Sequence, residues 1–181
     1  TMACVSGKLV AAQVMGRRPD IRTEGLSVDR FLPAAPGRGS AGRPQGVPAL
    51  QGSDFIVHGG DIGDAGILDA LAVIAPLTVV RGNNDREAWA EAIPETAFLK
   101  AGGVYIYAIH DLSQIDIDPA GAGVRVVISG HSHQPKVEER GGVLYVNPGS
   151  AGPRRFKLPI AVAELIVDGD TVSARIVELP L

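Results

Sequence analysis

The chain has 181 residues, of which 45% are hydrophobic and 20% are charged, and its formal net charge is −3. This length suits one compact domain with a buried core, and the composition excludes a fibrous or wholly disordered protein. The slightly acidic charge offers no basic surface for nucleic acid, so we expect no stable nucleic-acid binding, and Cys4, the only cysteine, cannot form a disulfide within the chain.

A short apolar run at residues 7–15 is the first patterned stretch of the chain. Gln13 interrupts this run, and Arg17 and Arg18 follow it where a signal peptide would need small residues. No stretch approaches the roughly 18 consecutive apolar residues of a membrane span. We therefore expect no signal peptide, no membrane association and a cytoplasmic location.

Residues 16–48 are expected to form a loop. The part from 33 to 48 holds four prolines and four glycines, and its apolar residues have neither helical nor strand spacing. We therefore divide the chain into an atypical, loop-rich segment at 1–48 and a folded domain at 49–181. The segment is either a genuine N-terminal extension or a stretch of DNA translated in the wrong frame.

The region between residues 54 and 80 predicts a βαβ unit. Residues 54–58 predict a buried strand, 67–74 have helical spacing and end before Pro76, and 77–80 predict a second strand. Both strands run into polar loops that contain glycine. Ligands collect at the carboxyl ends of parallel strands, so these loops are candidates for a site.

The remaining chain predicts mainly β-structure. Residues 104–110 and 124–129 are expected strands, and each leads into polar residues. Two hairpins are expected to follow, at 136–139 with 143–146 and at 161–167 with 171–179. Alternating α and β elements followed by antiparallel strands favour a layered α/β fold.

The expected strand ends carry side chains of the types that bind metals, namely Asp61, Asn83, His110, His131 and His133. Carboxylate, amide and imidazole groups together suit divalent ions such as Mn²⁺, Fe²⁺, Ni²⁺ or Zn²⁺. A carboxylate can bridge two ions about 4 Å apart, so the set predicts a dinuclear centre. Each residue alone is also compatible with an ordinary turn or core position.

The motifs of these loops have a recognisable order: HGGDIGD at 58–64, GNND at 82–85, a strand-terminal histidine, GHSH at 130–133 and NPGS at 147–150. In this order they resemble the calcineurin-like metallophosphoesterases, and within them the small bacterial and archaeal phosphodiesterase branch. The resemblance extends from residue 50 to residue 181. It implies a four-layer α/β/β/α sandwich of two facing mixed sheets.

The resemblance also implies a role for each metal-binding residue. Asp61 would bridge both metals, Asn83, His110 and His131 would complete the second site, and His133 would bind the first metal. Hydrolysis would depend most on Asp61, Asn83 and His131.

Three further residues would act on these ligands through hydrogen bonds. Asp85 would orient Asn83 or its loop. Asn84 stands where larger phosphatases of the superfamily carry a leaving-group histidine, and His58 would be a structural residue at the end of its strand.

The chain departs from the family at its N-terminus. Family members open with a strand that ends in Asp-x-His-Gly and binds the first metal, but no histidine precedes His58. The nearest similar run, at 20–22, ends in an arginine, whose guanidinium cannot ligate a metal. Three explanations are open: a frame error, which we favour, a protein that binds one metal, or replacement of the motif by an acidic residue. The acidic candidates are Asp20, Glu24 and Asp29.

The function implied is hydrolysis of a small phosphoester by a metal-activated water, as a phosphodiesterase or phosphatase. Two divalent ions per chain are expected, with Mn²⁺ first among the candidates. The alternative is a non-catalytic interaction module on the same fold, which the missing motif favours and the complete second site opposes. The substrate and assembly into a homo-oligomer stay open.

Overall fold

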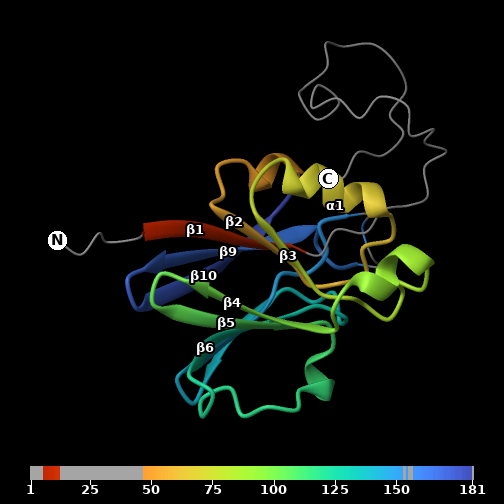
Figure 1. Cartoon of the computed structure of the whole chain (residues 1–181). Coiled ribbons are helices and arrows are strands. Elements are labelled where there is room, and N and C mark those ends of the chain that lie inside the picture. Colours follow the sequence, from red (N-terminus) through yellow and green to blue (C-terminus); the bar gives the residue numbers. More distant parts are fainter. Residues whose placement is uncertain (1–5, 13–46, 153, 155–156, 181) are drawn as a thin grey trace.

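The computed structural model describes residues 6–12, 47–152, 154 and 157–180. Two five-stranded sheets face each other (Figure 1). The first has the order β10-β9-β1-β2-β3 and contains β1 (Ser6–Ala12), β2 (Phe55–His58), β3 (Leu77–Val79), β9 (Ala161–Asp168) and β10 (Thr171–Glu178). The second has the order β4-β5-β6-β8-β7 and contains β4 (Thr96–Ala101), β5 (Val104–Ile109), β6 (Val124–Ser129), β7 (Lys136–Arg140) and β8 (Val143–Asn147).

Both sheets are mixed. In the first, β1, β2 and β3 run parallel, whereas β9 is antiparallel to β1 and β10. In the second, β5, β6 and β8 run parallel, and β4 and β7 are antiparallel edge strands. The parallel strands of each sheet bring their carboxyl ends to one edge, which is where the metal-binding residue types were predicted.

The strand β1 is not predicted by the sequence pattern. Its glycine and alanines have low strand propensity, yet it pairs on both sides, with Leu9 opposite Phe55 of β2 and Leu165 of β9. Residues 6–12 therefore belong to the same sheet as β2 and β9. The expected loop at 16–48 lies outside the described residues except for η2 (Val47–Leu50).

The main core lies between the two sheets. Alternate residues of β5 and β9 point into it, among them Ile106 and Leu165, which are fully buried. This alternation is the period-2 pattern of strands. The two sheets thus hold the strand ends rigidly relative to each other.

The helix α1 (Ala65–Ala72) covers part of the outer face of the first sheet. It begins at Asp64, whose side chain accepts a hydrogen bond from the Gly66 N–H at 2.8 Å, a typical N-cap. Leu71 is buried in a second cluster with Ile56 and Val162. No helix in the described part of the chain is long and apolar enough to cross a membrane.

The α/β sandwich of two facing mixed sheets is confirmed, with one difference in its outermost layer. Over the second sheet the described residues form η4 (Leu112–Gln114) and turns up to Val124 in place of an α-helix. Asp111 caps η4, and Asp118, Pro119 and Gly121 favour turns. Leu112 and neighbouring apolar residues cover Tyr107 and Val127 from this side.

The other predicted elements agree with the structure to within about two residues at their ends. Besides β1, η2 and η4, two further elements in the described ranges were not predicted: β4, and η3 (Ala88–Ala92). In β4, Phe98 and Lys100 are exposed between half-buried Ala97 and Leu99, because β4 is an edge strand with one face in water. The short alternation of small and charged residues hides it from a sequence reading.

Candidate metal centre

Four loops meet at one edge of the two sheets. They follow β2, β3, β5 and β6, and they are joined by backbone hydrogen bonds from Val80 to His58 (3.1 Å) and from Gly130 to His110 (2.9 Å). The two sheets also approach closely here, because a Cβ on Gly59 would lie 3.5 Å from the Gly130 nitrogen. The loops therefore form one site.

Asp61 lies at the middle of this site and is 1% exposed. Its Oδ1 accepts a hydrogen bond from the Asn84 backbone N–H (3.0 Å) and its Oδ2 accepts one from the Asn84 side-chain amide (2.8 Å). Oδ1 lies 3.5 Å from Nε2 of His110, and Oδ2 lies 3.9 Å from Nε2 of His133. The two carboxylate oxygens therefore face two different histidines, as a bridging carboxylate would.

Asn83 joins two histidines on one side of Asp61. Its Oδ1 lies 2.9 Å from Nε2 of His110 and 3.0 Å from Nδ1 of His131. The two rings are edge to face, with centroids 5.2 Å apart. Asp61, Asn83, His110 and His131 are thus brought together.

The tautomer of His110 decides what this cluster can hold. Its Nδ1 lies 2.7 Å from the carbonyl oxygen of Gly59, and since a carbonyl only accepts, Nδ1 carries a hydrogen and donates it. In the neutral ring Nε2 then presents a lone pair toward the oxygens of Asn83 and Asp61. Acceptors that face one another in this way need a cation or a proton between them.

The distances within the cluster fit a divalent ion. Two ligands that each lie about 2.1 Å from an ion, at angles of about 90–110°, are about 3.0–3.4 Å apart. The observed separations of 2.9, 3.0 and 3.5 Å are close to this range. No group of three His, Cys, Asp or Glu residues among those described is placed to hold a metal, so this site depends on the amide oxygen of Asn83.

The backbone of the centre is strained at the expected ligands. Among the described residues, the non-glycine residues with positive φ are Asp61 (57°), His131 (59°) and His133 (56°). Such conformations cost about 1–3 kcal/mol each and persist where the surrounding structure enforces them. Here the surrounding loops place Asp61 beside His133 and His131 beside Asn83.

Two glycines allow the loops to approach. A Cβ on Gly60 would lie 2.6 Å from Nδ1 of His110, and a Cβ on Gly82 would lie 2.2 Å from the Asp61 nitrogen. Neither distance is sterically allowed. The glycines in HGGDIGD and GNND are therefore required by close backbone contact.

Asp85 holds two of the loops together. It is 6% exposed, and its carboxylate accepts hydrogen bonds from the backbone of Ile62 (2.7 Å), Gly63 (3.2 Å) and Gly82 (2.8 Å). It thereby positions the Asn83 loop against the Asp61 loop. His58 is fully buried, and its Nδ1 accepts the Gly60 N–H at 3.1 Å.

Asn147 is a positioning residue whose role the sequence reading missed. Its side-chain amide donates to the Gly130 carbonyl (2.5 Å) and to Oγ of Ser132 (3.1 Å), so it holds the GHSH loop. The available signal was its place directly at the end of a strand, in NPGS. Asp111 also borders the site, and hydrogen bonds from Ser113 lower the pKa of its carboxyl group.

The other side of Asp61 has fewer candidate ligands in the described ranges. His133 is there, with a side chain 15% exposed. The strand β1 ends at Ala12, which pairs with His58, so its carboxyl end lies at this edge of the sheet. Asp20, Glu24 and Asp29, the acidic residues considered for this side, lie outside the described residues.

A family model for the calcineurin-like phosphoesterase superfamily domain matches residues 40–170. Two archaeal proteins, each named a probable metallophosphoesterase, are 32% identical to this chain. The protein from Methanothermobacter thermautotrophicus aligns over 71% of this chain and 78% of its own length. The one from Methanocaldococcus jannaschii aligns over 70% and 67%.

Solved structures show the same fold. An uncharacterised protein from Streptococcus pneumoniae, described as a predicted phosphoesterase, is 19% identical with a TM-score of 0.62, covering 98% of this chain and 91% of that one. Vacuolar protein sorting 29 from Cryptosporidium parvum is 16% identical with a TM-score of 0.67, covering 97% and 93%. The Entamoeba histolytica Vps29 was solved with Zn²⁺ and is 19% identical with a TM-score of 0.61, covering 94% and 98%. From the matched family model and the archaeal relatives, the chain belongs to the calcineurin-like phosphoesterase superfamily.

Proposed function

We propose that this protein is a metal-dependent phosphoester hydrolase that acts on small phosphodiesters, with Mn²⁺ as the first candidate ion and the cytoplasm as its location. The observation that carries this proposal is the convergence of Asp61, Asn83, His110 and His131, in which Nε2 of His110 faces the oxygens of Asn83 and Asp61. The family binds divalent metals, and the residue types present fit such an ion. The reaction consumes one water and yields a phosphomonoester and an alcohol.

The residues of the chain would divide the work as follows. Asn83, His110, His131 and Asp61 would hold one ion, and Asp61 and His133 would contribute to a second. When bound, divalent ions neutralise the charge of the phosphoryl group and lower the pKa of an attacking water. Asn84 orients the Asp61 carboxylate, and Asp85 keeps the two loops in register.

The leaving group is expected to receive little help from the protein. Asn84 stands where larger phosphatases have a histidine. Its side-chain amide donates a hydrogen bond to the carboxylate of Asp61. It is therefore engaged in positioning and is a poor general acid. This favours substrates whose leaving group needs no protonation, such as nitrophenyl esters.

The test is hydrolysis of bis(p-nitrophenyl) phosphate, with and without added Mn²⁺, alongside quantification of metal per chain. We expect Mn²⁺-dependent hydrolysis that EDTA removes and that is faster for the diester than for p-nitrophenyl phosphate. Full activity without any divalent ion would contradict the proposal.

A second candidate is a non-catalytic interaction module. It is favoured by the small number of candidate ligands around His133 in the described residues. Tight binding of one ion with no hydrolysis under any metal would support this candidate over the first.

A further inference from the structure

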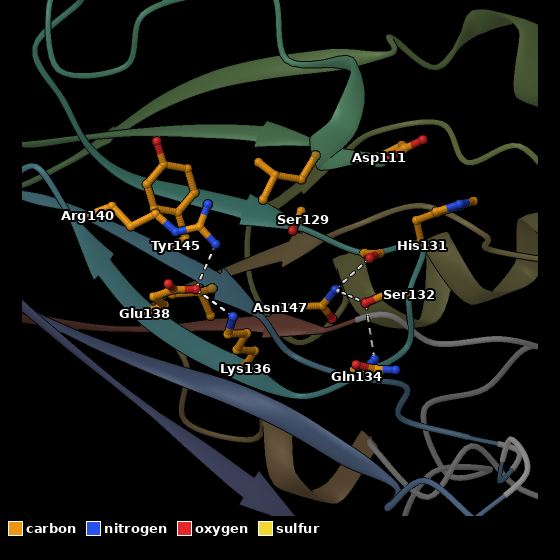
Figure 2. A pocket seen from close by; sticks show the side chains of 13 residues that line it. Asp111, Ser129, His131, Ser132, Gln134, Lys136, Glu138, Arg140, Tyr145 and Asn147 are labelled. Atoms are coloured by element: carbon orange, nitrogen blue, oxygen red, sulfur yellow. Dashed lines mark hydrogen bonds and ion pairs between the residues drawn. The ribbon is translucent and has the colours of Figure 1, made fainter.

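A pocket of about 270 Å³ opens beside the metal centre (Figure 2). His131 and Asn147 line it at the end near the centre, and Tyr145 and Arg140 line its other end. Small-molecule sites commonly measure about 300–1,000 Å³, so this pocket suits one part of a substrate. Because His131 borders both the pocket and the Asn83 cluster, a phosphoryl group at the centre would carry its ester substituent next to the pocket.

The pocket has an apolar wall on the outer face of the second sheet. Tyr145 and Leu112 both line it, and both are half-buried against the cluster that contains Tyr107, Val127 and Val143. Residues packed in this way keep a fixed orientation. The wall therefore offers a preformed apolar surface with one aromatic ring, which favours a planar aromatic partner.

A charged row stands along the pocket on β7. Lys136, Glu138 and Arg140 alternate along the strand and so share one face, and all three line the pocket. Glu138 forms ion pairs with Lys136 (2.6 Å) and with Arg140 (2.7 Å). One carboxylate between two cations leaves one net positive charge on the row. The Asp111 carboxylate, which also lines the pocket, balances it, so the lining carries no formal net charge and suits an uncharged organic group.

Arg140 also lies against the aromatic wall, although its side chain is 53% exposed. Its guanidinium lies 5.1 Å from the centroid of the Tyr145 ring, within the range of a cation–π contact. In the strand register, Glu138 is opposite Tyr145 and Lys136 is opposite Asn147. The polar row and the apolar wall thus run side by side away from the metal centre.

We propose that this pocket is a subsite for the organic group of a phosphodiester, and that Tyr145 and Leu112 select an aromatic group there. The inference rests on the proposed function, since it places the phosphoryl group at the Asn83 cluster. Tyr145 acts as a specificity residue and takes no part in the chemistry.

The test compares esters that differ only in the non-leaving group. Phenyl p-nitrophenyl phosphate and methyl p-nitrophenyl phosphate release the same nitrophenol. We expect kcat/KM with Mn²⁺ to be at least about tenfold higher for the phenyl ester than for the methyl ester, because the phenyl ring can contact the ring of Tyr145. Tyr145→Leu should reduce this preference to about twofold, and Leu112→Ala provides a second variant on the same wall.

A matched control comes from another aromatic ring of the same sheet. Tyr105 of β5 also carries a cation over its ring, Lys100 at 4.9 Å, but the pocket lining does not include it. Tyr105→Leu should leave the phenyl-to-methyl ratio unchanged. A fall of the ratio in this control as large as in Tyr145→Leu would overturn the proposal.

A binding measurement separates this inference from the proposed function. Titration calorimetry with phenylphosphonate and methylphosphonate, in the presence of Mn²⁺, needs no turnover. Tighter binding of the phenyl compound that Tyr145→Leu removes would support the subsite even if no ester is hydrolysed. Hydrolysis with equal ratios in parent and both wall variants, and equal phosphonate affinities, would reject the subsite and leave the hydrolase proposal standing.

Discussion

The two sides of Asp61 differ in how much of a metal site they contain. On one side, Asn83 places its amide oxygen about equally far from His110 and His131, at 2.9 and 3.0 Å. On the other side, His133 lies 3.9 Å from the carboxylate, and the described chain brings no further expected ligand to it. Loops that follow well-packed strands thus bring candidate ligands together on one side of Asp61 more completely than on the other.

The physical origin of the difference is the source of the ligands. The Asn83 side takes its residues from loops after β3, β5 and β6, which two packed sheets hold in place. The His133 side should also receive residues that follow β1, and the sequence lacks the expected motif there.

The largest expected effect is that of Asp61→Asn, because Asp61 faces both sides. Loss of one carboxylate charge should weaken the binding of both ions. It should lower kcat/KM for bis(p-nitrophenyl) phosphate by about 1,000-fold or more, which corresponds to a barrier higher by about 4 kcal/mol. Steady-state kinetics and metal quantification measure this. Asp64→Asn is the control, since asparagine caps a helix as well as aspartate does; comparable activity of Asp61→Asn and the parent would refute the bridging role.

The next effect separates the two sides directly. His131→Ala should lose the tightly bound ion and at least about 100-fold of activity, whereas His133→Ala should keep that ion and lose about tenfold. Metal content after dialysis, by mass spectrometry, distinguishes the two variants. If His133→Ala loses the tight ion and His131→Ala keeps it, the assignment of the sides is reversed.

A gain of function should follow from completing the weaker side. After Ala12, the last residue of β1, the sequence continues Gln13, Val14, Met15 and Gly16. The double change Gln13→Asp and Met15→His creates Asp-x-His-Gly directly after the strand. We expect a second ion per chain and activity about 10- to 100-fold above the parent.

The matched control for this design is Gln13→Asn with Met15→Leu, which has similar size and supplies no carboxylate or imidazole. Metal stoichiometry is the primary measurement. One ion per chain in both double variants would show that the end of β1 does not reach the His133 side.

A smaller effect concerns the stability of the loops. Gly60 and Gly123 both have positive φ, 90° and 74°, but a Cβ on Gly60 meets His110 at 2.6 Å whereas one on Gly123 meets nothing within 4 Å. Gly123→Ala should lower the free energy of unfolding by about 1 kcal/mol through backbone strain alone. Gly60→Ala should cost about 2–4 kcal/mol, as measured by denaturant unfolding, and equal losses would contradict the close-contact argument.

The smallest effect is a pH dependence of stability that arises from Glu138, which lines the pocket next to His131. Hydrogen bonds from Arg140 and Lys136 lower the pKa of Glu138 to about 2, from 4.5. Since the folded pKa lies below the unfolded value, this interaction stabilises the fold above about pH 4.5 and is lost as the pH falls toward 2. The contribution is small because the group is exposed; a carboxyl titration by NMR should give a midpoint near 2 that rises in Arg140→Met.

The sequence indicated the candidate residues of the centre because they stand at strand ends with clear patterns, and the structure brings Asp61, Asn83, His110 and His131 together. The strands at β2, β3, β5 and β6 were readable, and the order of their loops indicated the family. The sequence did not predict β1, whose small residues carry little strand preference and whose place depends on pairing with β2 and β9. Nor did it indicate that Asn147 fixes the GHSH loop, a contact between Asn147 and Gly130 that only folding creates.

The sequence by itself determined the candidate ligand types, their order along the chain and the glycines that let the loops meet, because these follow from local chemistry. The tertiary structure decided three further features. It gave Asp61 a positive φ and directed its two carboxylate oxygens toward different histidines. It placed Asn83 between His110 and His131, and it formed the pocket lined by Tyr145 and Arg140 from neighbouring strands. Each of these depends on how two sheets pack, since residues far apart in the chain come together only when the core between the sheets is formed.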